Sequence, residues 1–234
     1  MAERESALIV GVGRGLSASL ARLFAKEGMA VALAARDTGK LADLAAETGA
    51  TLHDCDSADP DSVARLFAAL DAGPGAPDLV VYNASNRGGR GPVEGLDAAA
   101  VRNAVLITCY GGFLVAQAAA RRMIERGSGT ILLTGALASV KGYANSSSFA
   151  MGKFGLRGLA QSLARELQPK NIHVGHFVID GGILQGPDDK RAASRGPDGM
   201  LHPDAIAQSY LHVHRQHRSA WSWEMELRPW VESF

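Results

Sequence analysis

Short apolar runs alternate with helix-length segments along most of this 234-residue chain. Uninterrupted apolar runs are typical of strands that are buried on both faces of a parallel sheet. Strands are expected at 7–10, 29–35, 51–55, 78–82, 130–134 and 172–179. Because connections between parallel strands are right-handed, helices come to lie on both faces of such a sheet. The pattern therefore predicts an α/β fold with a doubly wound parallel sheet.

The remaining segments complete this architecture. Helices are expected at 16–27, 38–47, 97–126, 146–168 and 203–216, with a further one beginning at Asp59-Pro60. Trp221, Trp223, Met225 and Leu227 alternate with polar residues, and this period of two indicates a seventh, half-buried strand. Residues 184–200 are polar and rich in Gly and Pro, so a loop or lid is expected there. The sequence predicts one Rossmann-type domain over residues 1–234, with a seven-stranded parallel sheet.

Composition excludes several classes of function. Lys plus Arg and Asp plus Glu both number 24, which gives no electrostatic case for binding nucleic acid or a membrane. The charged start is unlike a signal peptide, and no run approaches the roughly 20 apolar residues of a membrane span. Cys55 and Cys109 lack metal-ligand spacing, so reduced thiols in a cytoplasmic protein are expected. The spacing of His212, His214 and His217 fits a metal poorly, and no metal is predicted.

Glycines follow the first apolar run in the segment Gly11-Val12-Gly13-Arg14-Gly15-Leu16-Ser17. Between a strand and a helix, such glycines let the backbone approach a pyrophosphate that rests on the helix N-terminus. After the second strand, an acid would bind the ribose of NAD, whereas Arg suits the 2′-phosphate of NADP. Ala35 stands where the acid is expected, and Arg36 follows it. With Arg14 as a second cation, NADP(H) is the predicted cofactor, while Asp37 leaves NAD(H) possible.

The turn from Gly11 to Leu16 resembles that of the short-chain dehydrogenase/reductase family, with Ser17 in place of its last glycine. Asp56-Ser57 resembles the pair that contacts adenine in this family, and Asn83-Ala84-Ser85 resembles its Asn-Ala-Gly segment. The resemblance covers about residues 6–184. It implies an oxidoreductase in which Ile183 contacts the nicotinamide carboxamide and Lys153 bonds the ribose hydroxyls. It also implies that the helices at 97–126 and 146–168 pair into a homodimer or homotetramer.

The reaction centre departs from the family pattern. Family members protonate a carbonyl with a Tyr four residues before a Lys, while a Ser orients the carbonyl and an Asn holds a water chain. Lys153 is present, but the Tyr, Ser and Asn positions hold Phe149, Ala136 and Thr108. Thr108 could still hold a water, whereas Phe149 and Ala136 cannot donate or accept a proton. Since a positioned acid is worth about 10²–10⁴ in rate, the usual carbonyl chemistry is expected to be slow or absent.

Other groups near this centre offer a proton. Tyr143 carries a phenol, Ser146 lies on the same helix face as Lys153, and Asp180 follows the sixth strand. Each has an ordinary alternative role, as a pocket wall, a helix cap or a partner of local backbone. Two functions remain open. One is an NADP(H)-dependent oxidoreductase with an atypical proton source and an unknown small-molecule substrate, and the other is a catalytically inactive dinucleotide-binding sensor or assembly protein.

Charged residues in two loops complete the candidate set. Lys190, Arg191 and Arg195 could meet an anionic substrate or form a solvated charged surface. The segment Arg87-Gly88-Gly89-Arg90 is expected to be a turn beside a pocket rather than an RNA-binding motif, because the chain carries no net charge.

Overall fold

A single parallel sheet forms the centre of the molecule in this computed structural model, which describes residues 4–73 and 75–232. The sheet strands are β1 (Ser6–Val10), β2 (Ala30–Ala35), β3 (Thr51–Asp54), β4 (Leu79–Tyr82), β5 (Gly129–Thr134), β6 (Ile172–Ile179) and β9 (Glu224–Leu227). Within the described residues they lie in the order β3-β2-β1-β4-β5-β6-β9, and every pair is parallel. The predicted seven-stranded, doubly wound fold is confirmed.

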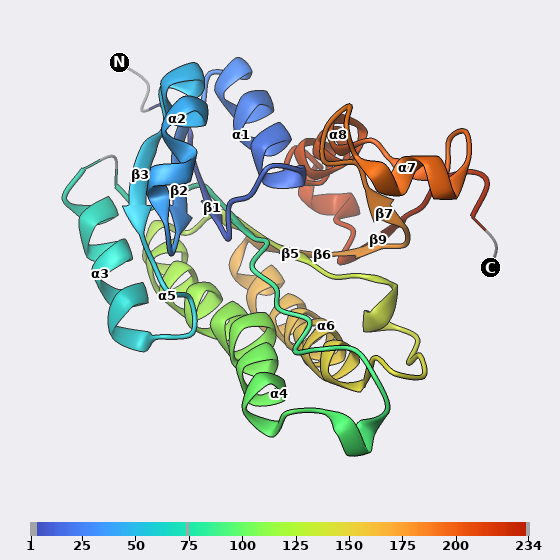
Figure 1. The fold of residues 1–234 in the computed structure, drawn as a ribbon. Helices are drawn as coiled ribbons and strands as arrows, with labels where there is room; N and C mark the ends of the chain where they lie inside the picture. The colour runs from blue at the N-terminus through green and yellow to red at the C-terminus, as the bar shows by residue number, and fades with distance from the viewer. Residues whose placement is uncertain (1–3, 74, 233–234) are drawn as a thin grey trace.

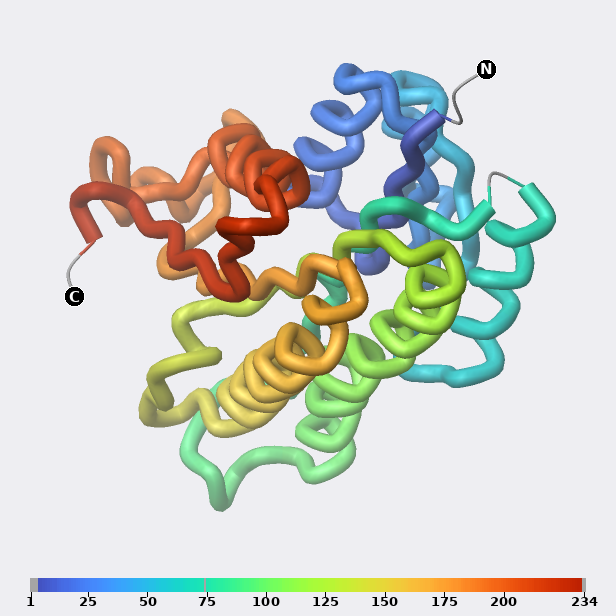
Figure 2. Tube along the Cα trace, turned by 180° about the vertical axis from the view of Figure 1, so that it is seen from behind, coloured from blue at the N-terminus to red at the C-terminus, as the bar shows by residue number. Residues whose placement is uncertain are grey.

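Helices cover both faces of the sheet (Figure 1). One face carries α1 (Leu16–Lys26), α2 (Ala42–Thr48) and α8 (Pro203–His214), and the other carries α3 (Pro60–Asp71), α4 (Ala98–Val105), α5 (Gly111–Arg126) and α6 (Ser147–Leu167). The view from behind shows α5 and α6 running side by side (Figure 2). The C-terminal elements gather beside β6, at the opposite end of the sheet from α3.

The core has two layers because successive strand residues point to opposite faces. On β1, Leu8 and Val10 pack with residues of α3, α5 and α6, whereas Ala7 and Ile9 pack with residues of α1 and α8. All five residues of β1 and all eight of β6 are buried. This burial on both faces explains why these strands appear in the sequence as continuous apolar runs.

Two helix boundaries follow from local chemistry, as predicted. Asp59 caps α3 by accepting a hydrogen bond from the Asp61 N–H at 3.1 Å, with Pro60 at the first helical position. Helix α6 ends at Leu167, just before Pro169, because a proline cannot continue the backbone hydrogen bonds of a helix.

The long helix predicted at 97–126 contains a π-helical turn, Leu106–Tyr110, between α4 and α5. The run Ala98–Arg126 is long and apolar enough to cross a membrane by length and composition alone. An 18-residue window within it has a mean hydropathy of 1.5. That finding corrects the expectation that no run approaches this threshold. In the structure one face of α5 packs in the core through Val115, Ala119 and Met123.

Two expectations for the C-terminal third were wrong in part. Residues 184–200 contain the short helix α7 (Lys190–Arg195), and β7 (Gly182–Ile183) pairs with β8 (Met200–Leu201) across this segment. Helix α7 forms because the Asp189 carboxylate accepts a hydrogen bond from the Arg191 N–H. Strand β9 begins only at Glu224, because Trp221 stacks on His173 with ring centroids 4.6 Å apart and its indole N–H donates to the Gln216 carbonyl.

Candidate functional site

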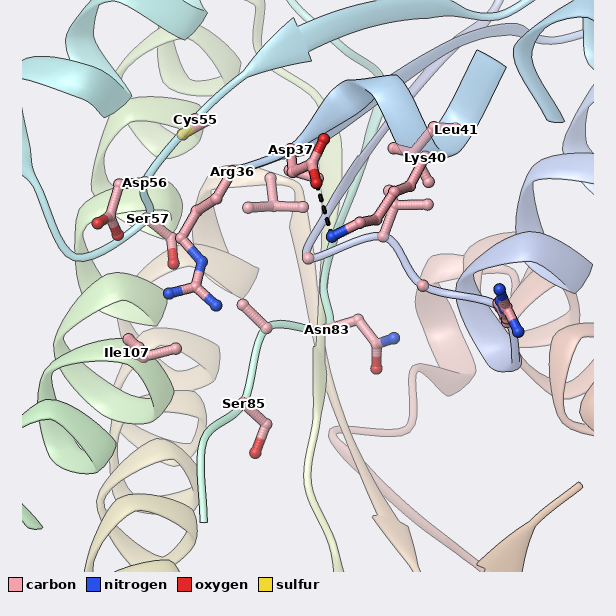
Figure 3. Close-up of a pocket in the computed structure, with 17 residues that line it drawn as sticks. Arg36, Asp37, Lys40, Leu41, Cys55, Asp56, Ser57, Asn83, Ser85 and Ile107 are labelled. Carbon is pink, nitrogen blue, oxygen red and sulfur yellow. Dashed lines mark ion pairs between the residues drawn. The ribbon is translucent and has the colours of Figure 1, made fainter. Parts of the chain in front are cut away.

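A cleft of about 470 Å³ lies at the carboxyl ends of the first strands (Figure 3). Its walls come from the segments that follow β1, β2, β3 and β4, and include Gly11, Arg36, Asp56, Ser57 and Asn83. The crevice beyond the strand ends is where doubly wound sheets bind their ligands. The structure therefore brings most of the predicted cofactor residues into one cavity.

The glycine turn has the shape that close backbone packing requires. Gly11 has φ +86°, and a Cβ at this position would lie 2.3 Å from the Ala84 nitrogen, so only glycine fits. Ser17 is buried; its hydroxyl donates to the Gly11 carbonyl at 3.2 Å and accepts from the Asn83 side chain at 2.6 Å. The serine that replaces the third glycine thus ties the turn to the segment after β4.

The N-terminus of α1 is suited to an anion. Its N-cap residue, Gly15, has no side-chain cap, and the first turn contains no acidic residue. The first backbone N–H groups of a helix without a cap are donors that favour phosphate. Gly13, Arg14, Leu16 and Ile183 line a smaller cavity of about 200 Å³ at this helix end.

Cations surround the region where a ribose phosphate would lie. Arg36 points across the cleft toward Ser57 (Figure 3), while Arg14 also lines it. The Lys40 ammonium lies 2.6 Å from the Asp37 carboxylate, and this hydrogen bond lowers the pKa of Asp37. Sequence reasoning missed Lys40, although its place just after β2 was a signal that could have been used. The glycine turn, the uncapped helix and these cations fit a nicotinamide dinucleotide.

Lys153 lies buried in α6 behind the predicted reaction centre. Its ammonium donates to the Thr134 carbonyl at 2.7 Å. Burial lowers the pKa of Lys153 to about 7, and the neighbouring charge of Arg87 acts in the same direction. Lys153 is therefore a group that exchanges a proton near neutral pH.

Two cationic side chains lie near the Phe149 ring. The Lys153 nitrogen lies 5.8 Å from the ring centroid, and the Arg87 guanidinium carbon lies 4.5 Å from it. In the part of the chain that the structure describes, no tyrosine hydroxyl is hydrogen-bonded to Lys153. By the resemblance, Phe149 stands at the position of the family's proton donor, and its ring has no proton to donate.

The other substituted positions have structural partners. The Thr108 hydroxyl accepts from the Asn86 N–H at 3.0 Å and donates to the Asn86 carbonyl at 3.3 Å, so both of its hydrogen-bonding roles are satisfied by one residue. The water-holding role expected of Thr108 stays a prediction, because the second lone pair of its hydroxyl remains an acceptor. The Ala136 N–H donates to the Ser139 hydroxyl at 3.1 Å, and its methyl group adds no polar contact.

The three alternative proton sources are placed differently. Tyr143 is 45% exposed, and its ring contacts the Lys141 ammonium. Ser146 is the N-cap residue of α6, but its hydroxyl makes no capping bond. Asp180 is buried beside Arg228, with 3.5 Å between their charged atoms. Burial raises the pKa of Asp180, and Arg228 opposes that rise.

A buried network that sequence reasoning missed lies behind this centre. His176 on β6 is 1% exposed, and its Nδ1 lies 3.0 Å from a Glu224 carboxylate oxygen. Arg157 holds both oxygens of the same carboxylate, at 2.6 and 2.8 Å. Burial lowers the pKa of His176 to about 4, although Glu224 opposes this. A histidine inside an otherwise apolar strand was the signal that could have revealed the network.

Several of the remaining charged candidates have partners. Arg191 binds Asp189 and the Ile183 carbonyl, and Arg195 lies 3.4 Å from Glu232. His214 lies between Thr130 and Glu5, while His217 contacts Ser219. Among residues 4–73 and 75–232, no group of three or more His, Cys, Asp or Glu side chains is arranged to hold a metal ion.

Comparison with known proteins identifies similar sequences and structures among short-chain dehydrogenases. A family model described as short chain dehydrogenase matches residues 5–185. The cis-4-hydroxycyclohexanecarboxylate dehydrogenase of Sinomonas cyclohexanicum is 32% identical over 219 residues, which cover 87% of this chain and 86% of that protein. The crystal structure of a short-chain dehydrogenase from Rhodopseudomonas palustris is 33% identical, with TM-score 0.83, and covers 97% of this chain and 99% of its own. A metagenomic short-chain oxidoreductase in complex with NADP is 25% identical, with TM-score 0.82, and covers 98% of this chain and 100% of its own.

Proposed function

This chain belongs to the short-chain dehydrogenase/reductase family, and from that premise we propose that it is an NADP(H)-dependent oxidoreductase with an atypical reaction centre. The family relationship supports binding of a nicotinamide dinucleotide, and the cleft is lined by the glycine turn and by cationic side chains that suit its phosphates. The observation that carries the proposal is the set of cations around that cleft, Arg14, Arg36 and Lys40, beside an uncapped helix N-terminus.

Preference for NADP(H) rests on the residues after β2. Arg36 reaches into the cleft, and a guanidinium suits a phosphate because its planar donors can form paired hydrogen bonds. Asp37, the acid that could favour NAD(H), is held by Lys40. A 2′-phosphate would compete with Asp37 for the Lys40 ammonium, so Arg36 and Lys40 are the residues proposed to select the cofactor.

Lys153 is the proposed proton donor. A bound dinucleotide would supply the hydride that reduces a carbonyl to an alcohol, with oxidation of the nicotinamide. The Lys153 ammonium donates the proton to the developing alkoxide and becomes an amine, which takes up a proton from solvent. A pKa of about 7 suits this role because an acid works best when its pKa lies near the operating pH. The reverse reaction would use the amine as the base.

A catalytically inactive dinucleotide-binding protein is the second candidate. The replacement of Tyr and Ser by Phe149 and Ala136 favours it, because neither side chain can bond a carbonyl oxygen. The exposure of Tyr143 and the pairing of Asp180 with Arg228 add to that case. In such a protein Lys153 would only bind the cofactor and would not transfer a proton.

The test combines binding with turnover. Dissociation constants for NADPH and NADH are measured for the wild type and for Arg36→Ala, with Arg65→Ala as a matched exposed arginine outside the cleft. NADPH should bind at least about tenfold more tightly than NADH, and Arg36→Ala should remove that preference.

Turnover is followed with 4-oxocyclohexanecarboxylate and other ketones, because a relative is named for the corresponding hydroxy acid. NADPH oxidation that Lys153→Met abolishes supports catalysis, and tight binding without turnover supports the inactive protein.

Assembly is a separate proposal. Large apolar side chains of α5 and α6 and of the turn before α5 are partly exposed: Tyr110, Phe113, Ile124, Met151 and Phe154. These two helices lie side by side (Figure 2). By the resemblance, they are the helices that pair between subunits. A second copy of this chain is the proposed occupant of that face. The expected cytoplasmic location stays a prediction.

A further inference from the structure

The Arg87 guanidinium and the Lys153 ammonium both face the ring of Phe149, at 4.5 and 5.8 Å from its centroid. In the described parts of the chain, neither cation has a carboxylate partner. A cation over an aromatic face gains some attraction, but the ring carries no net charge to neutralise it. Within the described residues, the ring therefore has beside it one guanidinium without a fixed negative charge and one lysine that burial shifts toward its neutral form.

The loop that carries Arg87 is held firmly in place. The Ser148 hydroxyl on α6 donates to the Arg87 carbonyl at 2.6 Å, and Thr108 bonds both backbone groups of Asn86. Gly88 follows with φ +66°, and a Cβ there would lie 2.6 Å from the Ala104 Cβ on α4. The loop thus fits closely between α4 and α6, and the position of the Arg87 backbone is fixed by both helices.

The side chains at the substituted positions have a common effect. Thr108 fixes Asn86, and Phe149 supplies the surface on which the next side chain, Arg87, rests. The Arg87 guanidinium carbon lies 4.5 Å from the ring centroid, and the N–H groups of a guanidinium can form paired hydrogen bonds with a planar anion. An anion here would also relieve the repulsion between Arg87 and Lys153, which lowers the pKa of Lys153.

We infer that Arg87 is a specificity-determining residue that pairs with a carboxylate of the substrate. In this arrangement the carbonyl or alcohol carbon of the same molecule lies toward Lys153. This inference rests on the proposed function, because both assign the same site to the substrate. A carboxylate matches the site because one planar guanidinium can bond both of its oxygens.

Binding of a charged and a neutral form of one ketone tests the inference without turnover. Calorimetry measures the affinity of 4-oxocyclohexanecarboxylate and of its methyl ester for the protein saturated with NADP⁺. The acid should bind about tenfold or more tightly than the ester, since a charge-assisted hydrogen bond contributes that much or more. Arg87→Gln should remove the difference, whereas Arg90→Gln, an exposed arginine in the same loop, should preserve it.

The outcomes separate this inference from the proposed function. If NADP⁺ does not bind, the proposed function fails, and the acid and ester are compared on the free protein. Equal affinity for acid and ester, no binding of either, or the same loss in both arginine variants would overturn the role of Arg87. Inorganic phosphate is added as a competitor. Displacement of the acid by phosphate at lower concentration than by acetate would also contradict a carboxylate site.

Discussion

The two substituted side chains at the reaction centre can be restored together. Ala136 is partly exposed beside the Ser139 hydroxyl, and Phe149 lies beside Lys153, so a serine and a tyrosine should fit at these positions. We predict that the double variant Ala136→Ser, Phe149→Tyr reduces ketones with NADPH about 10²–10⁴ times faster than the wild type, because a positioned acid contributes that much. Steady-state kinetics at fixed NADPH concentration measures the change.

The matched control is Phe149→Leu, which removes the ring without adding an acid. It should show no gain in rate. A double variant that binds NADPH normally and is no faster than the wild type would show that the pocket no longer places a carbonyl beside Lys153.

The buried Lys153 should make stability depend on pH. The pKa of Lys153 is about 7 in the folded chain and near its ordinary value of 10.5 when unfolded. Between these values the unfolded chain binds more protons, so stability rises with pH, by up to about 1 kcal/mol per unit. Urea denaturation at pH 7, 8.5 and 10 should show the wild type gaining stability relative to Lys153→Met.

Lys141→Met provides the comparison, since Lys141 is exposed. Its stability relative to the wild type should stay nearly constant over the same range. A constant difference for Lys153→Met as well would mean that this lysine titrates normally in the folded protein.

Among the elements, β9 depends on one carboxylate for its attachment. Glu224 bonds His176 on β6 and Arg157 on α6, and its side chain is only 20% exposed. Replacing Glu224 by Ala would leave both partners without their acceptor. We predict a loss of about 1–3 kcal/mol in the free energy of unfolding, measured by chemical denaturation at pH 7.

Glu166→Ala, at an exposed position of α6, serves as the control. It should change stability by less than about 0.5 kcal/mol. Faster hydrogen exchange confined to β9 and β6 in Glu224→Ala would show that the loss of stability is local to these strands. Equal losses of unfolding free energy in Glu224→Ala and Glu166→Ala would contradict the prediction.

Most elements were predictable because their signals are local. The strands β1 and β6 follow from continuous apolar runs, and the ends of α3 and α6 follow from Asp59-Pro60 and Pro169. Helix α7 was not predictable in this way, because its cap, Asp189, lies in a segment otherwise rich in Gly and Pro. The π-helical turn at Leu106–Tyr110 has no residue signature of its own, since it changes only the hydrogen-bond partner.

In the candidate site too, residues with local sequence signals could be predicted, whereas tertiary contacts could not. Gly11 and Arg36 could be assigned from sequence because strand ends of a doubly wound sheet converge on one cleft. The partners of Arg87 and His176 could not be assigned, because Phe149 and Glu224 are distant from them in sequence. The bond between Thr108 and Asn86 is likewise a tertiary contact that the sequence does not show, and the water-holding role of Thr108 stays a prediction.

At the scale of the whole molecule, the exposed face of α5 and α6 should join subunits. Phe113 is 39% exposed and Phe154 is 44% exposed, and apolar side chains of this size favour burial. We predict that the wild type is a dimer or tetramer by light scattering and that Phe113→Asp, Phe154→Asp together shift it toward monomer. Burying two unpaired charges in the contact would cost several kcal/mol.

Val93→Asp tests whether any added surface charge has this effect. Val93 is 74% exposed and lies before α4, outside the proposed contact. That variant should keep the wild-type mass. A wild type that is monomeric at micromolar concentration would refute the assembly proposal.

The wide turn at Leu106–Tyr110 affects how insertions and deletions would act on this protein. A π-helical turn accommodates about one extra residue, so deleting one residue here would restore a regular α-helix without turning α4 and α5 against each other. Only the side chains inside the turn would change direction, so that Thr108 would leave Asn86 while the apolar face of α5 would stay in the core. In an alignment, a single-residue gap at this point would mark relatives whose segment at Asn86 and Arg87 is held by another means.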